Sequence, residues 1–248
     1  MAQPLSIAML GSPVNEGSSG PVRGQLNAIL KSNTVSRYCV PNEFICSEIG
    51  RFLGLPIPPC GICYIKPKTK DDPAHWFASL NFNLTGVDLP PIDVNQCCSL
   101  CSFEAVGVVL FDILIGNCDR HENNLSLDLS RPIPQLSVFD HDRALFGGGI
   151  DSGQSRLERD IEDFIVGYHC LIGAIENDDH FAAWCERIEG LPNYLIDQVC
   201  TATVPLELIS ASEANTAKRF LKQRKSKLKD LIYSNKGDFA GIKSWHLI

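Results

Sequence analysis

The hydrophobic pattern is densest in residues 106–115 (VGVVLFDILI), where apolar side chains fall on every side of a helix. An all-round apolar pattern predicts a buried helix rather than an amphipathic surface helix. Gly116 and Asn117 end this helix, and the polar loop CDRHENN follows. The segment QLSVF then predicts a short strand that leads directly to Asp140. The pattern thus predicts a buried helix, a charged loop and a strand, in that order.

The N-terminal third has shorter apolar segments, which predict strands around one helix. Residues 22–30 (VRGQLNAIL) are expected to form a strand that leads into Lys31, and residues 60–65 (CGICYI) a further strand. Between them, apolar residues spaced three and four apart predict a helix, with Asn42 as its N-cap and Gly54 just beyond its end. The apolar face of this helix comprises Ile45, Ile49, Phe52 and Leu53.

Polar segments divide the chain after these strands. Residues 66–73 (KPKTKDDP) are polar and contain prolines, a composition typical of a hinge between lobes. Residues 75–96 have no clear period and are expected to form loops with short elements. The three glycines at 147–149 predict a mobile connector.

The C-terminal part reads as helical. Asp178 or Asp179 is expected to cap the helix HFAAWCERIEG, and Ser210 with Glu213 has the spacing of a capping box. Residues 217–233 carry seven Lys and Arg between apolar positions. Because the chain as a whole is acidic, a solvated helix face is favoured over a nucleic-acid-binding face.

Length and charge narrow the class of protein. With 248 residues the chain can bury a sizeable core, as one domain or as two lobes around a cleft. The net charge of −7 argues against nucleic acid or an anionic membrane as the main partner. No apolar run is long enough to span a membrane, and the N-terminus lacks the basic region of a signal sequence. The sequence therefore predicts a cytoplasmic protein without direct contact with nucleic acid or membrane.

Eleven cysteines, an odd number, lie mostly among apolar neighbours, which favours reduced, buried thiols over a disulfide framework. Two close pairs have the local spacing of zinc ligands, Cys60 with Cys63 and Cys98 with Cys101. The first pair lies in an expected strand and the second near the start of the buried helix. Packed thiols are therefore favoured over a structural zinc site.

The loop after the buried helix carries the clearest chemistry. Asp119 can orient the proton of a hydroxyl group, Asn124 can turn back toward a metal ion, and Asp140 supplies a carboxylate from the next strand. This set suits phosphoryl transfer. His121 is expected to hold the loop in place, although a metal site built from Asp119, His121 and Asp140 is an alternative. A Ser/His/Asp hydrolase is disfavoured because the sequence has no G-x-S-x-G elbow.

The segments DRHENN, FDHDRALF and NEFICSEIGRFLGLPIPP resemble the HipA-like kinases and, more distantly, the phosphoinositide-kinase-like branch of the kinase superfamily. By motif the resemblance spans residues 11–146. It implies that Asp119 is the catalytic aspartate and that Asn124 and Asp140 bind the metal. Family members often have a glycine where this chain has Asp142, so Asp142 is a second candidate ligand.

The same resemblance gives the N-terminal residues a role in binding ATP. Lys31 is implied to contact the phosphates, and Glu43 to pair with Lys31, with Glu48 as the rival for that pairing. HipA-like kinases autophosphorylate on a serine of the loop that covers the phosphates, so Ser18 and Ser19 are candidate sites. The covering loop comprises Gly17, Ser18, Ser19 and Gly20.

These features predict an α+β, protein-kinase-like fold with two lobes. Residues 1–70 are expected to form a small β-rich N-lobe with one helix, and residues 71–248 a mainly helical C-lobe. The predicted activity is ATP- and Mg²⁺-dependent transfer of the γ-phosphoryl group to a Ser or Thr hydroxyl of a protein. The expected partners are an unidentified protein substrate and a regulatory protein. The alternatives are a kinase of a small molecule or lipid head group, and a nucleotide-binding pseudokinase that acts through protein contacts.

Overall fold

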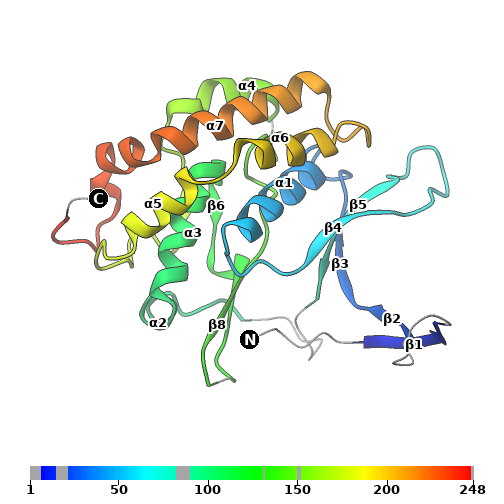
Figure 1. Ribbon diagram of the computed structural model, residues 1–248, viewed down its shortest axis with the longest axis horizontal. Coiled ribbons are helices and arrows are strands. Elements are labelled where there is room, and N and C mark those ends of the chain that lie inside the picture. Colours follow the sequence, from blue (N-terminus) through cyan, green and yellow to red (C-terminus); the bar gives the residue numbers. More distant parts are fainter. Residues whose placement is uncertain (1–6, 15–21, 82–89, 131, 150–151, 247–248) are drawn as a thin grey trace.

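A computed structural model describes residues 7–14, 22–81, 90–130, 132–149 and 152–246 (Figure 1). Strands dominate the N-terminal third and helices dominate the rest, so the predicted α+β class is confirmed. In Figure 1 helices α4, α6 and α7 lie across the top of the molecule, α5 lies below them beside α3, and the sheet of β3, β4 and β5 lies beside α1.

A three-stranded antiparallel sheet holds Lys31 at the end of its first strand. Its order is β3–β5–β4, formed by Ala28–Lys31, His75–Leu80 and Cys60–Tyr64. Lys31 pairs with Phe77 on β5, and the buried ring of Phe77 belongs to a small apolar cluster against α1. The sheet therefore fixes the backbone of the lysine from one side.

Helix α1 (Cys39–Phe52) packs against β4 and β5 on one side and against α6 (Asn193–Ala202) on the other. Because both sides are covered, most of its residues are buried, including the polar Asn42 and Glu43. The predicted apolar face is confirmed at three positions, but Phe52 is 51% exposed. Asn42 is not the N-cap, because the helix begins three residues earlier.

Further contacts tie both ends of α1 to the helical part of the chain. The Tyr38 hydroxyl donates a hydrogen bond of 2.7 Å to Glu213, and the Tyr38 ring stacks on Phe146. At the other end, Arg187 donates to the carbonyl of Leu53 over 3.4 Å. The helix is thus anchored in the C-terminal part as well as in the sheet.

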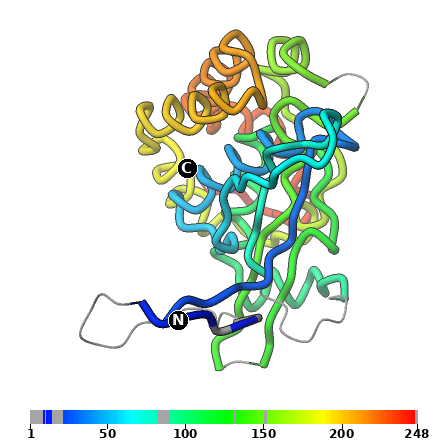
Figure 2. The backbone as a smooth tube through the Cα atoms, turned by 90° about the vertical axis from the view of Figure 1, so that its right-hand side faces the viewer, coloured from blue at the N-terminus to red at the C-terminus, as the bar shows by residue number. Residues whose placement is uncertain are grey.

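Strands β1 (Ile7–Pro13) and β2 (Val22–Leu26) form a separate antiparallel hairpin. Figure 2 shows this hairpin, in dark blue, projecting from the body of the molecule, and every residue of β2 is exposed. The strand predicted for residues 22–30 is therefore interrupted at Asn27, where the chain passes from one sheet to another. The predicted phosphate-covering residues Gly17, Ser18, Ser19 and Gly20 lie outside the described residues.

The segment 66–73 is not a hinge between lobes. It connects β4 to β5 within one antiparallel hairpin, in which Tyr64 pairs with His75. Its polar residues and prolines suit the exposed tip of a hairpin as well as they suit a hinge. The sheet therefore extends to Leu80, beyond the boundary expected at residue 70, while the division into two lobes stays a prediction.

The remaining elements are mostly helical. Three 3₁₀ helices cover Glu122–Asn124, Asp160–Glu162 and Lys236–Asp238. Four short strands form two pairs, a parallel one from β6 (Asp119–Arg120) and β9 (Tyr168–His169), and an antiparallel one from β7 (Leu125–Asp128) and β8 (Gln135–Val138). The other helices are α2 (Val94–Leu100), α3 (Ser102–Ile115), α4 (Gln154–Arg159), α5 (Phe181–Glu189) and α7 (Ala211–Ser234).

The buried helix predicted from the apolar pattern is α3, and it is confirmed. Every residue from Ala105 to its end at Ile115 is buried, and it contacts α2, α5 and α7. At Gly107 the indole ring of Trp184 on α5 lies so close that an added Cβ would overlap it. Gly116 ends the helix with φ of 63°, a conformation that glycine adopts without strain.

The capping box predicted at Ser210 and Glu213 is confirmed at the start of α7. The basic residues of α7 do not all lie on a solvated face, because Arg224 is fully buried. Its guanidinium donates to the carbonyls of Ile113 and Leu114. Both carbonyls lie in the last turn of α3, where that of Ile113 also accepts a 3.4 Å bond from the amide of Gly116. Arg224 therefore closes the end of α3 from which the loop 117–124 departs.

Neither Asp178 nor Asp179 caps α5, since no side chain caps its first residue. Asp178 instead accepts hydrogen bonds from the backbone and ring nitrogens of His246. None of the eleven cysteines is in a disulfide. Among the described residues, no single helix is long and apolar enough to cross a membrane, although α2 and α3 together meet that length and composition despite a bend of 112°.

Candidate active site

Lys31 contacts two carboxylates that come from different parts of the chain. Its ammonium group forms an ion pair with Glu43 on α1 and a second ion pair, of 2.8 Å, with Asp140. Burial alone would lower the pKa of Lys31, but the charges of Glu43 and Asp140 raise it well above its usual value. The lysine is therefore firmly cationic and joins the sheet, α1 and the segment after β8.

Glu43 is almost fully buried, and its second oxygen lies 3.4 Å from Nδ1 of the buried His141. Burial would raise the pKa of Glu43, but the contact with His141 and the charge of Lys31 lower it. Glu48, the rival for the lysine, pairs with Arg51 one turn further along the helix. Glu43 is thus the residue that the structure brings to Lys31.

The β7–β8 hairpin brings Asn124 and Asp140 to one end, and a hydrogen bond ties Asn124 to the backbone of Asp119. Asn124 immediately precedes β7, and Asp140 follows β8, so the antiparallel pairing of Leu125 with Val138 places them at the same end. The side-chain amide of Asn124 donates a bond of 2.8 Å to the carbonyl of Asp119. That bond uses the amide nitrogen, so Oδ1 is the side-chain atom that can serve the predicted metal site.

Arg120 fixes the backbone of this arrangement, a role that the sequence analysis did not predict. Its guanidinium donates to the backbone carbonyls of Asn124, Phe139 and Asp140. Asp140 has φ of 63°, a conformation that costs a non-glycine residue energy and persists where its surroundings hold it. The bonds from Arg120 supply that support.

Arg120 is itself held by Asp112, in the last turn of α3. Two hydrogen bonds of 2.8 and 3.0 Å join the fully buried guanidinium and carboxylate. His169 lies 3.2 Å from the same carboxylate, and Asn117 donates to it. Burial would raise the pKa of Asp112, but the charge of Arg120 holds it well below its usual range. Asp112, the only carboxylate inside the apolar run, thus anchors the loop 117–124 through Arg120.

His121 does not perform the expected scaffolding. Its Nδ1 accepts a hydrogen bond from the amide of Asn123, two residues along, at the start of a 3₁₀ helix. The scaffolding belongs to Arg120, the preceding residue. The DRH sequence gave no signal of which of the two side chains points inward.

Asp142 differs from Asp140 in its surroundings. Burial and the nearby charge of Asp140 raise the pKa of Asp142 to about 6. Burial would also raise the pKa of Asp140, but the charge of Lys31 lowers it. Asn42 donates to the backbone carbonyls of Asp142 and Gly147. The first of the three glycines is therefore buried and held in place by α1.

Two alternative metal sites are not assembled. Within the described residues, the one group of three or more His, Cys, Asp or Glu ligand atoms within 4.8 Å of one another is Asp178, Asp179 and His246. Asp119, His121 and Asp140 therefore do not form a joint ligand set. The two cysteine pairs lie on different elements, β4 and the α2–α3 corner.

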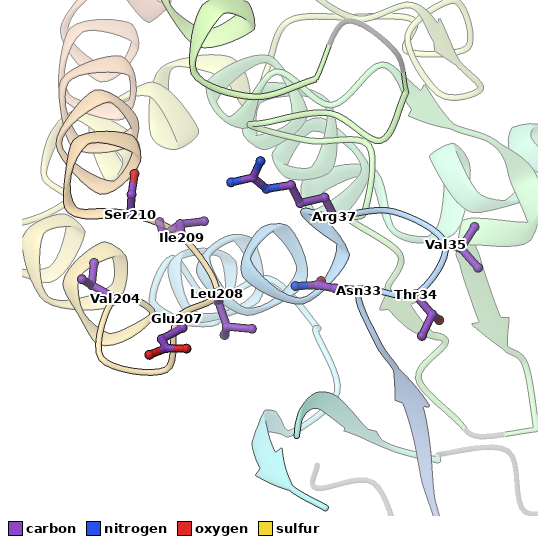
Figure 3. A pocket seen from close by; sticks show the side chains of 9 residues that line it. All are labelled: Asn33, Thr34, Val35, Arg37, Val204, Glu207, Leu208, Ile209 and Ser210. Carbon is purple, nitrogen blue, oxygen red and sulfur yellow. The ribbon is translucent and has the colours of Figure 1, made fainter. Parts of the chain in front are cut away.

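A surface pocket of about 600 Å³ lies apart from these residues, between the β3–α1 loop and the α6–α7 loop (Figure 3). Val204, Leu208 and Ile209 give it apolar walls, and Arg37 and Glu207 supply charges. None of the predicted site residues lines it.

Residues 24–148, half of the chain, match the profile of the HipA-like kinase family. The chain therefore belongs to this family, as the motifs predicted, and its class of activity is that of a kinase, a phosphotransferase. No curated protein matches the chain.

The solved structures that resemble this chain include a kinase and a toxin–antitoxin protein. The Helicobacter pylori proinflammatory kinase CtkA superposes with a TM-score of 0.58 and 13% identity, over 86% of this chain and 91% of that one. HipA of Shewanella oneidensis MR-1, from a toxin–antitoxin complex with HipB and operator DNA, gives a TM-score of 0.45 and 14% identity. This match covers 98% of this chain and 69% of that chain. At this identity, the likeness to CtkA confirms the kinase fold alone.

Proposed function

We propose that this chain is an ATP- and Mg²⁺-dependent kinase that transfers the γ-phosphoryl group to a Ser or Thr hydroxyl of a protein. The observation that carries the proposal is the double contact of Lys31 with Glu43 and Asp140. This contact joins a phosphate-binding cation to the metal-binding carboxylate in the arrangement that phosphoryl transfer needs.

The donor set fits magnesium. Asp140 offers a carboxylate and Asn124 an amide oxygen, and Mg²⁺ prefers oxygen ligands and binds through few protein groups. When bound, the ion neutralises charge on the phosphates of ATP. We assign the metal to Asp140 rather than to Asp142 because Arg120 and Lys31 fix the backbone and the carboxylate of Asp140.

Each residue of the site has a separate role in the proposed phosphoryl transfer. Lys31, held by Glu43, binds phosphate oxygens as a point charge. Asp119 accepts a hydrogen bond from the acceptor hydroxyl and aligns it for in-line attack. The rigid base of Arg120 and Asp112 limits the reorganisation that these groups undergo during transfer.

The direct test is incubation with labelled ATP, with and without Mg²⁺, first alone and then with host lysate. Wild-type protein should label a protein acceptor only with Mg²⁺, and Asp119→Ala should not. A Mg-ATP-dependent rise in melting temperature without transfer would favour the pseudokinase, and label in small molecules or lipids the other alternative. No binding of ATP at millimolar concentration would contradict the proposal.

Autophosphorylation on Ser18 or Ser19 is part of the proposal and rests on the family resemblance. The expected regulatory partner rests on the same resemblance, and the cytoplasmic location rests on the sequence. Mass spectrometry after incubation with ATP tests the modification. Phosphate on these serines in wild type but not in Asp119→Ala is the expected result, and an active enzyme that stays unmodified would contradict it.

A further inference from the structure

The two-stranded pair of β6 and β9 has an inner and an outer face. Asp119 pairs with Tyr168, and Arg120 pairs with His169, in a parallel register. Paired residues point to the same side, and successive residues to opposite sides. Arg120 and His169 are buried against Asp112, so Asp119 and Tyr168 share the outer face, where Tyr168 is 56% exposed.

Glu122 brings a carboxylate to this outer face. The Tyr168 hydroxyl donates a hydrogen bond of 2.8 Å to Glu122 Oε1. The backbone of Glu122 is also held, because its carbonyl accepts from the amide of Ile92. Both the main chain and the carboxylate of Glu122 therefore have a fixed position, three residues after the proposed catalytic aspartate.

The carboxylate of Glu122 is anionic, and the nearby charge of His121 stabilises that form. The hydrogen bonds of its own backbone and of Tyr168 lower the pKa of Glu122, so it is ionised at neutral pH. No described Lys or Arg lies within ion-pair distance of it. An anionic oxygen beside the exposed face of a tyrosine ring is a good receptor for a cationic side chain, which can pair with the carboxylate and lie over the ring.

We infer that Glu122 and Tyr168 form a subsite for a Lys or Arg of the acceptor protein, close in space to the phosphorylated hydroxyl. This inference rests on the proposed function and adds the substrate class to it, a basic segment. A polypeptide that presents its hydroxyl to Asp119 must pass this face, since Asp119 and Tyr168 are direct neighbours across the two strands.

The test compares wild type with Glu122→Lys, Tyr168→Phe and a matched control, Glu186→Lys. Glu186 is exposed, on α5, and its substitution makes the same change in net charge as Glu122→Lys. Dephosphorylated host lysate is incubated with each protein and Mg-ATP, and phosphorylation sites are mapped by mass spectrometry. A peptide spanning the strongest site is then made with Lys, Ala or Glu at each flanking position, and kcat/KM is measured.

Wild type and Glu186→Lys should prefer Lys over Ala at one flanking position by about two- to fivefold, the range of an exposed ion pair. Glu122→Lys should reverse the ranking of the Lys and Glu peptides. Tyr168→Phe, which keeps the ring and removes the hydrogen bond, should reduce the preference through KM rather than kcat.

Transfer with a ranking that is the same in wild type and Glu122→Lys would overturn this inference and leave the proposed function standing. The absence of any wild-type site would overturn both.

Discussion

Lys31 is the residue on which the candidate site converges, so its removal is the sharpest single change. Lys31→Met keeps much of the volume and removes the cation that contacts Glu43 and Asp140. The loss of a preorganised charge at the phosphates should lower kcat/KM about 100-fold or more. It should also reduce the rise in melting temperature that Mg-ATP produces, which for a ligand at 100 times its Kd corresponds to about 2.7 kcal/mol.

The control for this change is Lys68→Met, on the exposed β4–β5 connection. Lys68→Met should behave as wild type in both measurements. Full activity in Lys31→Met would contradict the assignment of the lysine to the phosphates.

Substitutions of Asp119 and Asp140 should affect different steps, phosphoryl transfer for Asp119 and Mg²⁺-dependent binding of ATP for Asp140. Asp119→Asn removes the group that orients the hydroxyl, so transfer should be lost while Mg-ATP still raises the melting temperature. Asp140→Asn removes a charged metal ligand, so the Mg²⁺-dependent part of that rise should also be lost. Calorimetric titration of ATP with and without Mg²⁺ measures the difference. If Asp142→Asn has the larger effect on Mg²⁺, the metal belongs to Asp142 instead.

At the scale of elements, the buried pair of Asp112 and Arg120 joins α3 to the loop 117–124, which carries the proposed catalytic aspartate. Arg120→Met leaves a buried carboxylate with fewer partners and should cost about 3–5 kcal/mol of unfolding free energy, as should Asp112→Leu. The double variant, with no buried charge left unpaired, should recover much of that loss, which urea unfolding measures. It should not recover kinase activity, because the carbonyls of Phe139 and Asp140 lose their donor. If the double variant recovers both stability and kinase activity, Asp112 and Arg120 have a purely structural role.

The packing of α3 against α5 gives a second prediction at this scale. Gly107→Ala adds a methyl group where the Trp184 ring already lies, so overpacking should outweigh the better helix propensity of alanine. The expected cost is about 1–3 kcal/mol of unfolding free energy. Gly61→Ala is the control, since no atom lies within 4 Å of the added group. Equal stability of the two variants would show that α5 can shift to make room.

The sequence predicted elements and site residues where the signal was local. Asp119 and Asn124 lie in one short loop, and the apolar run and the capping box are continuous patterns. The long-range contacts of Asn42, Glu213 and Tyr168 were missed because their partners lie far away in the chain. Tyr38 and Glu213, for example, are 175 residues apart.

Asp112 could have been found from the sequence. A single carboxylate inside an all-round apolar helix must find a buried partner. Arg120 is the first cationic residue after it. By contrast, the assignment of residues 66–73 to a hinge failed because polar, proline-bearing composition marks hairpin tips and hinges alike. Only the pairing of β4 with β5 separates the two.

For the whole molecule, the buried carboxylates set the response to acid. Asp112 and Glu43 have pKa values below their ordinary 3.8 and 4.5, because their cationic partners outweigh burial. A carboxyl group whose pKa is lower in the folded state than in the unfolded state stabilises the protein at pH values above its unfolded-state pKa. This stabilisation is lost as the pH falls through its folded-state pKa. The unfolding free energy should therefore fall steeply below about pH 4. The variant with both Asp112→Leu and Arg120→Met should show a shallower fall, and an identical slope would contradict the assignment.

The anchoring of α1 at both ends has a consequence for pharmacology. One way for an inhibitor to gain selectivity would be to push the helix that carries Glu43 outward and fill the space behind it. Here such a compound would have to break the Tyr38–Glu213 bond, the Asn42 contacts and the packing against α6 at once. Compounds of that kind should bind this protein poorly. Chemical screens are better aimed at molecules that leave the helix where it is and distinguish this enzyme by its acceptor side.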